Sequence, residues 1–213
     1  MKTRILMSAL GVIICAVSVA IFKVAAFGVD PFQSFMSGID KFIPISFSIL
    51  YMIVNAVLLL FSLKFDRHYI GIATFINLFL LGGVTEFSYN ILCSLLPEPA
   101  MIIRILFFLI AIVIICIGSA LYMTADLGVS TYDAIALIMA NKWKLGKFKF
   151  IRIITDIVCV ICGAVLFLAG HGKVNEIPAF IGIGTIVTAF FMGPLIEFFN
   201  VHIARPMLNG KSK

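Results

Sequence analysis

Long apolar runs separated by short polar segments dominate the hydrophobic pattern of this chain. The runs lie near residues 5–26, 45–64, 70–95, 101–123, 150–170 and 176–200. Each run is long enough to cross about 30 Å of hydrocarbon as an α-helix. The pattern therefore predicts an all-α polytopic membrane protein with six transmembrane helices, folded as a single membrane domain over residues 1–213.

Two of the apolar runs end in a glycine that is followed by a helix-start signal. In the first segment Asp30 is a suitable N-cap residue and Gln33 follows three positions later, which is the spacing of a capping box. In the second segment Ser130 and Asp133 hold the same positions. The sequence therefore predicts that one helix stops and a new one starts at each of these two places.

A helix break at bilayer depth exposes backbone groups that hydrocarbon cannot satisfy. Such a break survives only when it is buried in protein or lines a wet cavity. We expect the chain to turn at Gly28 and Gly128 and then to form short half-helices near 31–40 and 131–141 that do not cross the bilayer. Matched breaks in two halves of a chain are typical of the binding site of a secondary transporter.

The two halves also resemble each other beyond the breaks. The segment Ile-Gly-Ile-Ala-Thr at 70–74 aligns with Ile-Gly-Ile-Gly-Thr at 181–185. Self-similarity of this kind indicates an internal duplication, and chance similarity between apolar segments is the alternative. Because each copy crosses three times, the second copy starts from the other side. We predict two inverted three-helix repeats, about 5–95 and 104–200, each with a broken first helix followed by a half-helix.

Composition and charge support a membrane protein and exclude several other classes. The chain is 62% hydrophobic and 12% charged, which no soluble domain of this length matches. The net charge of +6 fits basic cytoplasmic loops rather than a nucleic-acid surface. The basic start of the first run also permits a signal peptide, but the run is long enough to span and lacks a clear cleavage site, which favours a retained helix.

The distribution of basic residues predicts the topology. With the N-terminus inside, twelve of the 16 basic residues fall in cytoplasmic segments, and the positive-inside rule then places both termini in the cytoplasm. The twelve are Lys2, Arg4, Lys64, Arg67, Lys142, Lys144, Lys147, Lys149, Arg152, Arg205, Lys211 and Lys213, against Lys23, Lys41, Arg104 and Lys173 outside.

Acidic residues within or beside the membrane segments are the candidate functional groups. A carboxylate in hydrocarbon costs a few kcal/mol even on lenient scales, so such residues mark ion or substrate sites. For substrate binding we predict Asp30, Gln33, Ser130, Tyr132 and Asp133; for a coupling ion Glu86, Asp126, Asp156 and Glu197; and as supporting residues Lys23, Asn55, Gly28 and Gly128.

Each of these residues also has a structural interpretation. Asp30 and Asp133 would serve as helix caps alone. Asp156 would form an ion pair with a cytoplasmic lysine, and Glu197 would reach the interface beside Arg152. For Glu86 the alternative is a hydrogen bond to a neighbouring helix, and Lys23 would extend to the outer interface as a snorkelling side chain.

Catalytic and metal-binding motifs are missing from the sequence. It contains no Walker A loop, no His-Glu-x-x-His pair and no Gly-x-Ser-x-Gly elbow. The five cysteines, an odd number mostly within apolar runs, argue against a disulfide framework. We therefore expect no enzyme, no catalytic residue, no metal and no cofactor.

The two breaks resemble the Leu-Gly-x-x-Pro-x-Asp type loops of the YczE/YyaS/YitT-like bacterial membrane proteins. The Gly-Pro pair ending at Pro194 is also similar. This chain departs from the pattern in a complementary way: the first loop keeps Pro31 but has Gln33 in place of the acid, and the second keeps Asp133 but has Thr131 in place of the proline. The resemblance implies a multi-pass protein of the bacterial cytoplasmic (inner) membrane, of transporter type, and no particular substrate.

The leading hypothesis from the sequence is a small secondary transporter (permease) of a polar small molecule or ion, coupled to a proton or sodium gradient. It would work by alternating access around the paired breaks. The alternatives are a substrate-binding subunit of an ATP-driven vitamin importer, a non-transporting membrane scaffold or regulator, and a channel. The expected partners are the lipid bilayer and the small-molecule or ion substrate, with no nucleic acid, and a homodimer is left open.

Overall fold

The computed structural model describes residues 2–43, 45–179 and 181–208, and the side chains of all of these except Lys149 and Ala179. Three basic side chains that entered the charge distribution, those of Lys149, Lys211 and Lys213, therefore lie outside the described part. Within the described ranges every regular element is helical.

In the described ranges, six segments are long and apolar enough to cross a membrane, which supports the prediction of a multi-pass helical membrane protein. The α-helices are α1 (Lys2–Ala25), α2 (Pro31–Phe42), α3 (Phe47–Phe65), α4 (Ile72–Leu95), α5 (Met101–Thr124), α6 (Thr131–Leu137), α7 (Phe148–Ala169), α8 (Ile183–Phe199) and α9 (Arg205–Leu208). Shorter turns are η1 (Arg67–Tyr69), η2 (Ile138–Lys142), η3 (Val174–Ala179) and η4 (Asn200–Ala204).

Two predicted boundaries differ from the structure. The last long helix, expected from residue 176, begins at Ile183, because η3 with its internal Pro178 forms a separate 3₁₀ turn before it. The second half-helix, expected over 131–141, is α-helical only to Leu137 and continues as the π-helical turn η2.

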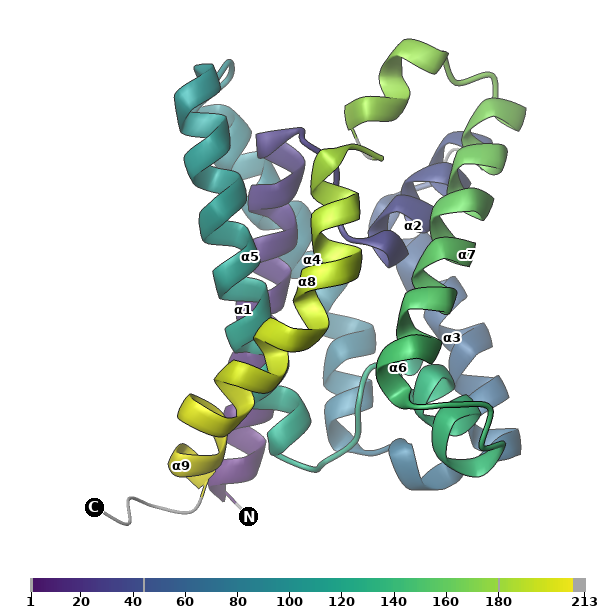
Figure 1. Cartoon of the computed structure of the whole chain (residues 1–213). Coiled ribbons are helices and arrows are strands. Elements are labelled where there is room, and N and C mark those ends of the chain that lie inside the picture. Colours follow the sequence, from purple (N-terminus) through teal and green to yellow (C-terminus); the bar gives the residue numbers. More distant parts are fainter. Residues whose placement is uncertain (1, 44, 180, 209–213) are drawn as a thin grey trace.

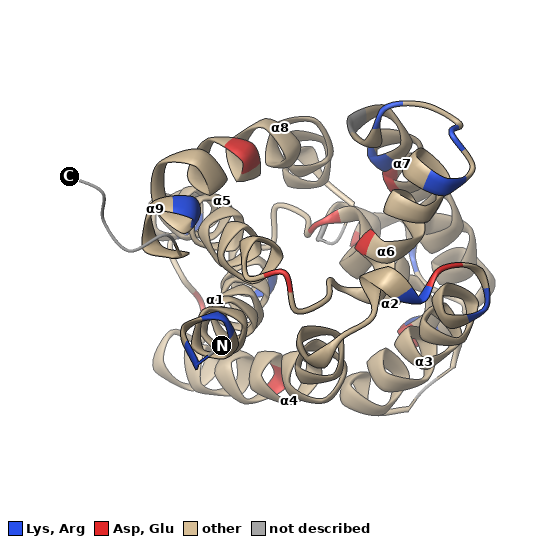
Figure 2. Cartoon of the chain, turned by 90° about the horizontal axis from the view of Figure 1, so that it is seen from below, with Lys and Arg blue, Asp and Glu red and all other residues tan. Residues whose placement is uncertain are grey.

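The helices form two groups that lie side by side. In the first group α4 and α5 pack on α1, and α8 packs on α5. In the second group α2 packs mainly against α7, and α6 packs against α3 and α7. Figure 1 shows both ends of the described chain at the same end of the bundle, with α2 near the opposite end and α6 near the end that holds the termini. Viewed along the bundle in Figure 2, the two groups enclose a central region with acidic positions near it.

Small residues allow the closest helix contacts. A Cβ atom added at Gly11 of α1 would lie 2.7 Å from the carbonyl oxygen of Gly118 of α5. The Ser18 hydroxyl donates to the carbonyl oxygen of Ala111 at 2.7 Å between the same two helices. Close backbone approach and such hydrogen bonds replace the hydrophobic effect as the force that joins helices in lipid.

Both predicted breaks are present, and they have nearly the same backbone geometry. Gly28 has φ +101° and Gly128 has φ +104°, a conformation that favours glycine. After each glycine the chain turns back before the short helix begins, as Figure 1 shows for the α1–α2 connection. Asp30 caps α2 by accepting from Gln33 N at 3.2 Å, and Ser130 caps α6 by accepting from Asp133 N at 3.1 Å.

The caps are one-sided rather than the reciprocal boxes that the spacing predicted. Gln33 Oε1 is buried and has no hydrogen-bond partner among the described residues. The Asp133 carboxylate accepts from side chains, including the Ser130 hydroxyl at 2.6 Å. The third residue of each short helix is thus available for a task other than capping.

Each break is held by the first turn of a long helix from the other half of the chain. Gly184 N of α8 donates to the carbonyl oxygen of Phe27 at 2.8 Å. Ala73 N of α4 donates to the carbonyl oxygen of Leu127 at 2.9 Å. These bonds satisfy backbone groups that a break would otherwise leave unpaired inside the membrane.

Candidate functional site

A cavity of about 490 Å³ lies between the two groups of helices. Its lining residues extend from the two breaks towards the ends of α5 and α8 and the start of α7, where both termini lie. Its volume is within the range of small-molecule sites, about 300–1,000 Å³. All five predicted substrate-binding residues line it: Asp30, Gln33, Ser130, Tyr132 and Asp133.

A buried arginine joins two of the predicted carboxylates. The Arg152 guanidinium pairs with the Asp133 carboxylate and, through Nε at 3.2 Å, with Oδ1 of Asp156. Arg152 and Asp156 are four residues apart on α7, so they share one helix face. Asp133 lies in the first turn of α6, which packs against α7. A charge that is costly in hydrocarbon is thereby compensated by two opposite charges.

Hydroxyl groups complete this charged cluster. Tyr132 Oη donates to Oδ1 of Asp156 at 2.6 Å, and Tyr122 Oη donates to Oδ2 of Asp133 at 2.5 Å. The guanidinium of Arg152 also lies over the Tyr132 ring, 4.4 Å from its centre. Hydrogen bonds to ionised groups are about twice as strong as neutral ones, so the cluster is held firmly in one arrangement.

A second network next to the first is neutral. The Thr131 hydroxyl donates to Oδ1 of Asn55 at 2.5 Å, and Nδ2 of Asn55 donates to the carbonyl oxygen of Tyr51 at 2.8 Å. Tyr51 Oη donates to Oδ1 of Asn77 at 3.1 Å. The predicted supporting residue Asn55 therefore links α3 to the start of α6, and it lines the cavity.

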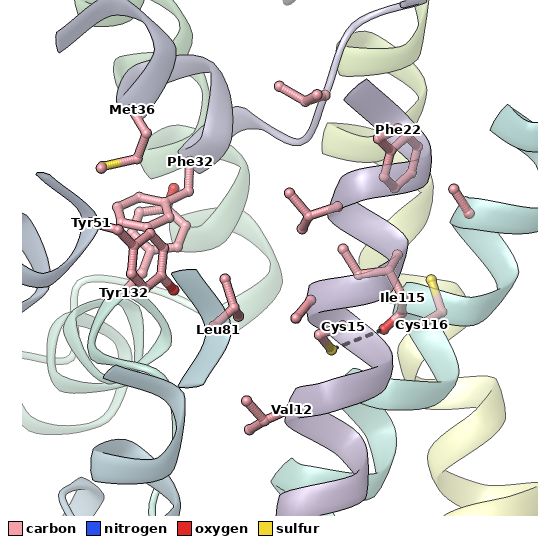
Figure 3. Close-up of a cluster of buried hydrophobic side chains, with 14 of the residues drawn as sticks. Val12, Cys15, Phe22, Phe32, Met36, Tyr51, Leu81, Ile115, Cys116 and Tyr132 are labelled. Atoms are coloured by element: carbon pink, nitrogen blue, oxygen red, sulfur yellow. Dashed lines mark hydrogen bonds between the residues drawn. The ribbon is translucent and has the colours of Figure 1, made fainter. Parts of the chain in front are cut away.

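The start of α2 contributes a carboxylate of a different kind. Asp30 is only 8% exposed, and among the described residues no basic side chain forms an ion pair with it. Phe32 stacks on Tyr132 with 4.9 Å between ring centres, and Tyr51 lies edge-on to Phe32 at 6.0 Å. Figure 3 shows these three rings grouped together, apart from Cys15 and Ile115 on α1 and α5.

The structure does not bring all predicted residues to the cavity. Glu86 is exposed and accepts a hydrogen bond from Ser48 of α3, which is the structural interpretation given for it. Asp126 lies at the surface, where it pairs with Arg4 at 3.7 Å. The Lys23 ammonium lies 3.5 Å from the centre of the Phe47 ring. The cavity lining includes none of these three predicted residues.

Two of the pairings expected for membrane acids are different in the structure. Asp156 pairs with Arg152 rather than with a lysine. Glu197 lines the cavity but pairs with Arg205 at 3.6 Å rather than with Arg152. The charge distribution had counted Arg152 only as a basic residue of a cytoplasmic segment; it lies in the second turn of α7, where its side chain is 20% exposed and pairs with two carboxylates. The i,i+4 Arg–Asp spacing in an otherwise apolar helix is the signal that would have found it.

Residues that could hold a metal are not grouped in this fold. In the described ranges, no set of three or more His, Cys, Asp or Glu side chains is close enough to bind an ion. All five cysteines are free thiols. The cavity is instead equipped with carboxylates, one guanidinium, amides and phenols, which bind organic groups, protons or monovalent ions.

Two curated bacterial proteins are similar to this chain in sequence. An "Uncharacterized membrane protein YczE" of Bacillus subtilis is 26% identical over 192 residues, which cover 88% of this chain and 81% of that protein. An "Uncharacterized protein" of Haemophilus influenzae is 27% identical over 136 residues, which cover 64% of this chain and 56% of that protein. This chain thus spans little more than half the length of the Haemophilus protein, and no solved structure matches it. The model of the family of unknown function DUF6198 matches residues 2–201, so the chain belongs to this family, and its resemblance to the YczE-like membrane proteins is confirmed.

Proposed function

We propose that this protein is a small secondary transporter of a polar small molecule or ion, coupled to a proton or sodium gradient. The observation that carries the proposal is the central cavity, which both helix breaks reach and which holds buried, hydrogen-bonded charges. Buried ionisable groups in a membrane bundle are expensive and mark substrate or proton pathways. Discontinuous helices at such a cavity are the usual construction of a transporter site.

Paired features of the two halves support an inverted repeat as the basis of alternating access. The glycines of the breaks share one backbone conformation, and each break is bonded to the other half of the chain. The short helices α2 and α6 lie near opposite ends of the bundle. Under this proposal the group of α1, α4, α5 and α8 rocks against the group of α2, α3, α6 and α7, and the cavity between them changes the side to which it opens.

The described conformation corresponds to an opening at the end that holds the termini. The cavity lining there includes Met123, Phe148 and Asn200, whereas α2 and α7 pack closely at the other end. With both termini in the cytoplasm, as the basic residues predict, this is an inward-open state. Closing it would bring the ends of α5 and α8 towards the start of α7.

The charged cluster supports a role in coupling. Arg152 is shared between Asp133 and Asp156, so a proton or sodium ion that neutralises one carboxylate shifts the guanidinium towards the other. A local charge change of this kind can bias a two-state element such as the contact between α6 and α7. Under this proposal, ion coupling depends on the carboxylate of Asp133 more than on the backbone geometry of the break.

The test is transport by purified protein in proteoliposomes on a solid support. Amino acids, organic cations, carboxylates and simple ions are applied in turn, with and without proton and sodium gradients. We expect a saturable current from one compound class that is lost in Asp133→Asn. This variant should still fold, because an amide oxygen accepts from Tyr122 and Ser130 and because Asp156 still pairs with Arg152.

Glu86→Gln serves as the matched control, because Glu86 is an acidic membrane residue outside the cavity. It should transport as the wild type does. Silence across the whole panel from folded protein would overturn the proposal and direct attention to a subunit that needs partners. Normal coupled current in folded Asp133→Asn would remove that residue from the mechanism.

A further inference from the structure

The start of α2 carries a buried hydrogen-bond acceptor without a partner and, beside it, a carboxylate without an ion pair among the described residues. Gln33 is 3% exposed and lines the cavity, and its Oε1 atom has no partner among the described residues. Asp30, one turn earlier, uses Oδ1 to cap the helix and forms no ion pair within the described part of the chain. A buried amide oxygen without a donor is unfavourable, and a ligand that donates a hydrogen bond to it would recover the lost interaction.

The charge of the cavity selects the sign of that ligand. Four carboxylates line the cavity against a single guanidinium; they are Asp30, Asp133, Asp156 and Glu197, against Arg152. Arg152 is committed to two of them, and Glu197 has Arg205 as its partner. Among the described residues that line the cavity, Asp30 is therefore the carboxylate without an ion-pair partner. A buried charge requires an opposite one, so the ligand that completes this site is a cation.

The rest of the wall selects an apolar body. Facing the break, α1, α4 and α5 contribute Cys15, Val19, Leu81 and Ile115 to the lining. The rings of Phe32, Tyr51 and Tyr132 lie on the opposite side, as Figure 3 shows. An ion with a complete hydration shell gains nothing from such surfaces, whereas an organic cation buries its hydrocarbon against them.

A second, apolar cleft borders this cavity. A cleft of about 220 Å³ lies between α7 and α8 and shares Asp156, Ala189 and Phe190 with the central cavity. Its other walls are almost entirely apolar, from residues that include Ile157, Ile161 and Ile186, and the side chains of these three are 46%, 58% and 61% exposed. In a bilayer an exposed apolar cleft next to the cavity favours a ligand that partitions into the lipid before it binds.

We infer that the substrate is an amphipathic organic amine. Its protonated primary ammonium binds the Asp30 carboxylate and Gln33 Oε1, and its apolar body lies against α1, α4 and α5. This inference rests on the proposed function, since it names the substrate class of the same cavity. The amine of a lipid headgroup has the same chemistry as that of a free small amine, and the experiment separates the two sources.

The experiment is calorimetric titration of the purified protein in nanodiscs of phosphatidylcholine and phosphatidylglycerol, neither of which carries a primary amine. The probes are phenethylamine, phenethyl alcohol and 3-phenylpropionate, which share one apolar body and differ in charge. We expect saturable binding of the amine, at least tenfold tighter than that of the alcohol, and no binding of the carboxylate. Phosphatidylethanolamine is then added to the nanodiscs. If it displaces the probe, the result supports the site and assigns it to a lipid amine.

Variants connect the binding to the proposed residues. Asp30→Asn keeps a good N-cap and removes the charge, and it should weaken the binding of phenethylamine at least tenfold. Gln33→Leu removes the unpartnered oxygen and should weaken the binding of phenethylamine about fivefold, a typical value for one hydrogen bond. Asp40→Asn is the matched control, because Asp40 is an acid on the same helix outside the cavity lining, and it should bind as the wild type does.

Equal binding of amine and alcohol, no binding of either, or unchanged amine binding in both folded variants would overturn the inference. Its failure is separable from that of the proposed function. Transport of another compound class without amine binding would overturn only the inference. Amine binding without any transport would overturn only the proposal that the protein is a transporter.

Discussion

At the start of α2 the buried carboxylate of Asp30 has no ion-pair partner among the described residues, whereas at the start of α6 the carboxylate of Asp133 is held by Arg152, Tyr122 and Ser130. The two short helices nevertheless follow glycines of nearly identical φ. The same difference continues on the neighbouring long helices. There, α3 presents Tyr51 and Asn55, and α7 presents Arg152 and Asp156.

The comparison separates the frame of the site from its chemistry. The break, the capped half-helix and the bond to the other half of the chain recur in both halves. The ion triad does not recur, since the neutral Tyr51 and Asn55 of α3 correspond to Arg152 and Asp156 of α7. A scaffold that positions side chains by backbone geometry permits this divergence, because only a few positions at the break decide what it binds. Under the proposed function, this difference predicts a ligand-binding half and a coupling half.

Breaking the triad should have the largest effect on stability. Arg152→Gln leaves two carboxylates buried without a cation, and removing one partner of a buried pair costs about 3–5 kcal/mol. Equilibrium unfolding in mixed detergent micelles measures this change. As a control, adding Asp133→Asn and Asp156→Asn to Arg152→Gln removes the unpaired charges and should restore most of the loss. A loss below about 1 kcal/mol for the single variant would show that the triad is hydrated rather than buried.

Substituting either of the two break glycines should lower the free energy of unfolding strongly, and by a similar amount in both halves. A Cβ atom at Gly28 would lie 2.6 Å from Gly182 N, and one at Gly128 would lie 2.5 Å from Gly71 N. The positive φ adds strain of about 1–3 kcal/mol for a residue other than glycine. We expect Gly28→Ala and Gly128→Ala each to lower unfolding free energy by about 3 kcal/mol, within about 1 kcal/mol of each other.

The control for the glycine pair is Gly83→Ala in α4, where an added Cβ meets nothing within 4 Å. It should be neutral or stabilising by up to about 1 kcal/mol, because alanine is the better helix former. The same unfolding measurement applies to all three variants. A large loss at one break and none at the other would show that the breaks are not equivalent in the folded protein.

Most of the frame could be predicted from the sequence because it depends on local rules. The length of an apolar run predicts a membrane-spanning helix. A glycine followed shortly by Asp-Pro or by Ser predicts that one helix ends and the next begins. The end of α6 was less predictable, because the π-helical turn after Leu137 depends on packing around it. The start of α8 was misplaced because apolar composition alone does not reveal where a 3₁₀ turn replaces a helix.

The site was predictable only in part. Five lining residues followed from the breaks themselves, but the partner of Asp133 did not, because Arg152 is nineteen residues away and belongs to a different helix. The charge rule assigned basic residues near helix ends to one side of the membrane, and that rule does not resolve which of them point into the bundle. Tyr122 and Tyr51 were missed because a tyrosine in an apolar run gives no signal until its hydroxyl partner is known.

The tyrosines that serve the two networks give a sharper form of the comparison. Tyr132 donates to a carboxylate at 2.6 Å, and Tyr51 donates to an amide oxygen at 3.1 Å. Removing a hydrogen bond to a charged group costs about 1.5–3 kcal/mol and a neutral one about 0.5–1.5 kcal/mol. Tyr132→Phe should therefore destabilise more than Tyr51→Phe by about 1 kcal/mol in the same unfolding measurement. If the order is reversed, the triad does not carry ionised carboxylates.

The smallest effect is expected from two arginines exactly one hundred positions apart in the two halves, Arg4 and Arg104. Arg104 donates to the carbonyl oxygens of Ala25 at 2.8 Å and Ala26 at 3.0 Å, where α1 ends, in a partly buried place. Arg4 reaches Asp126, which occupies the corresponding position after α5, only as a surface pair at 3.7 Å.

Charge-assisted bonds to otherwise unpaired carbonyls at a helix end outweigh an exposed ion pair that is screened by water. We expect Arg104→Met to cost about 1–2 kcal/mol of unfolding free energy and Arg4→Met less than about 0.5 kcal/mol. Raising the salt concentration should reduce the effect of Arg4→Met further and leave that of Arg104→Met nearly unchanged, because only the exposed pair is open to screening. Equal costs for the two variants would mean that both helix ends are equally exposed. The end of the bundle near α2 would then be packed no more tightly than the end near α6.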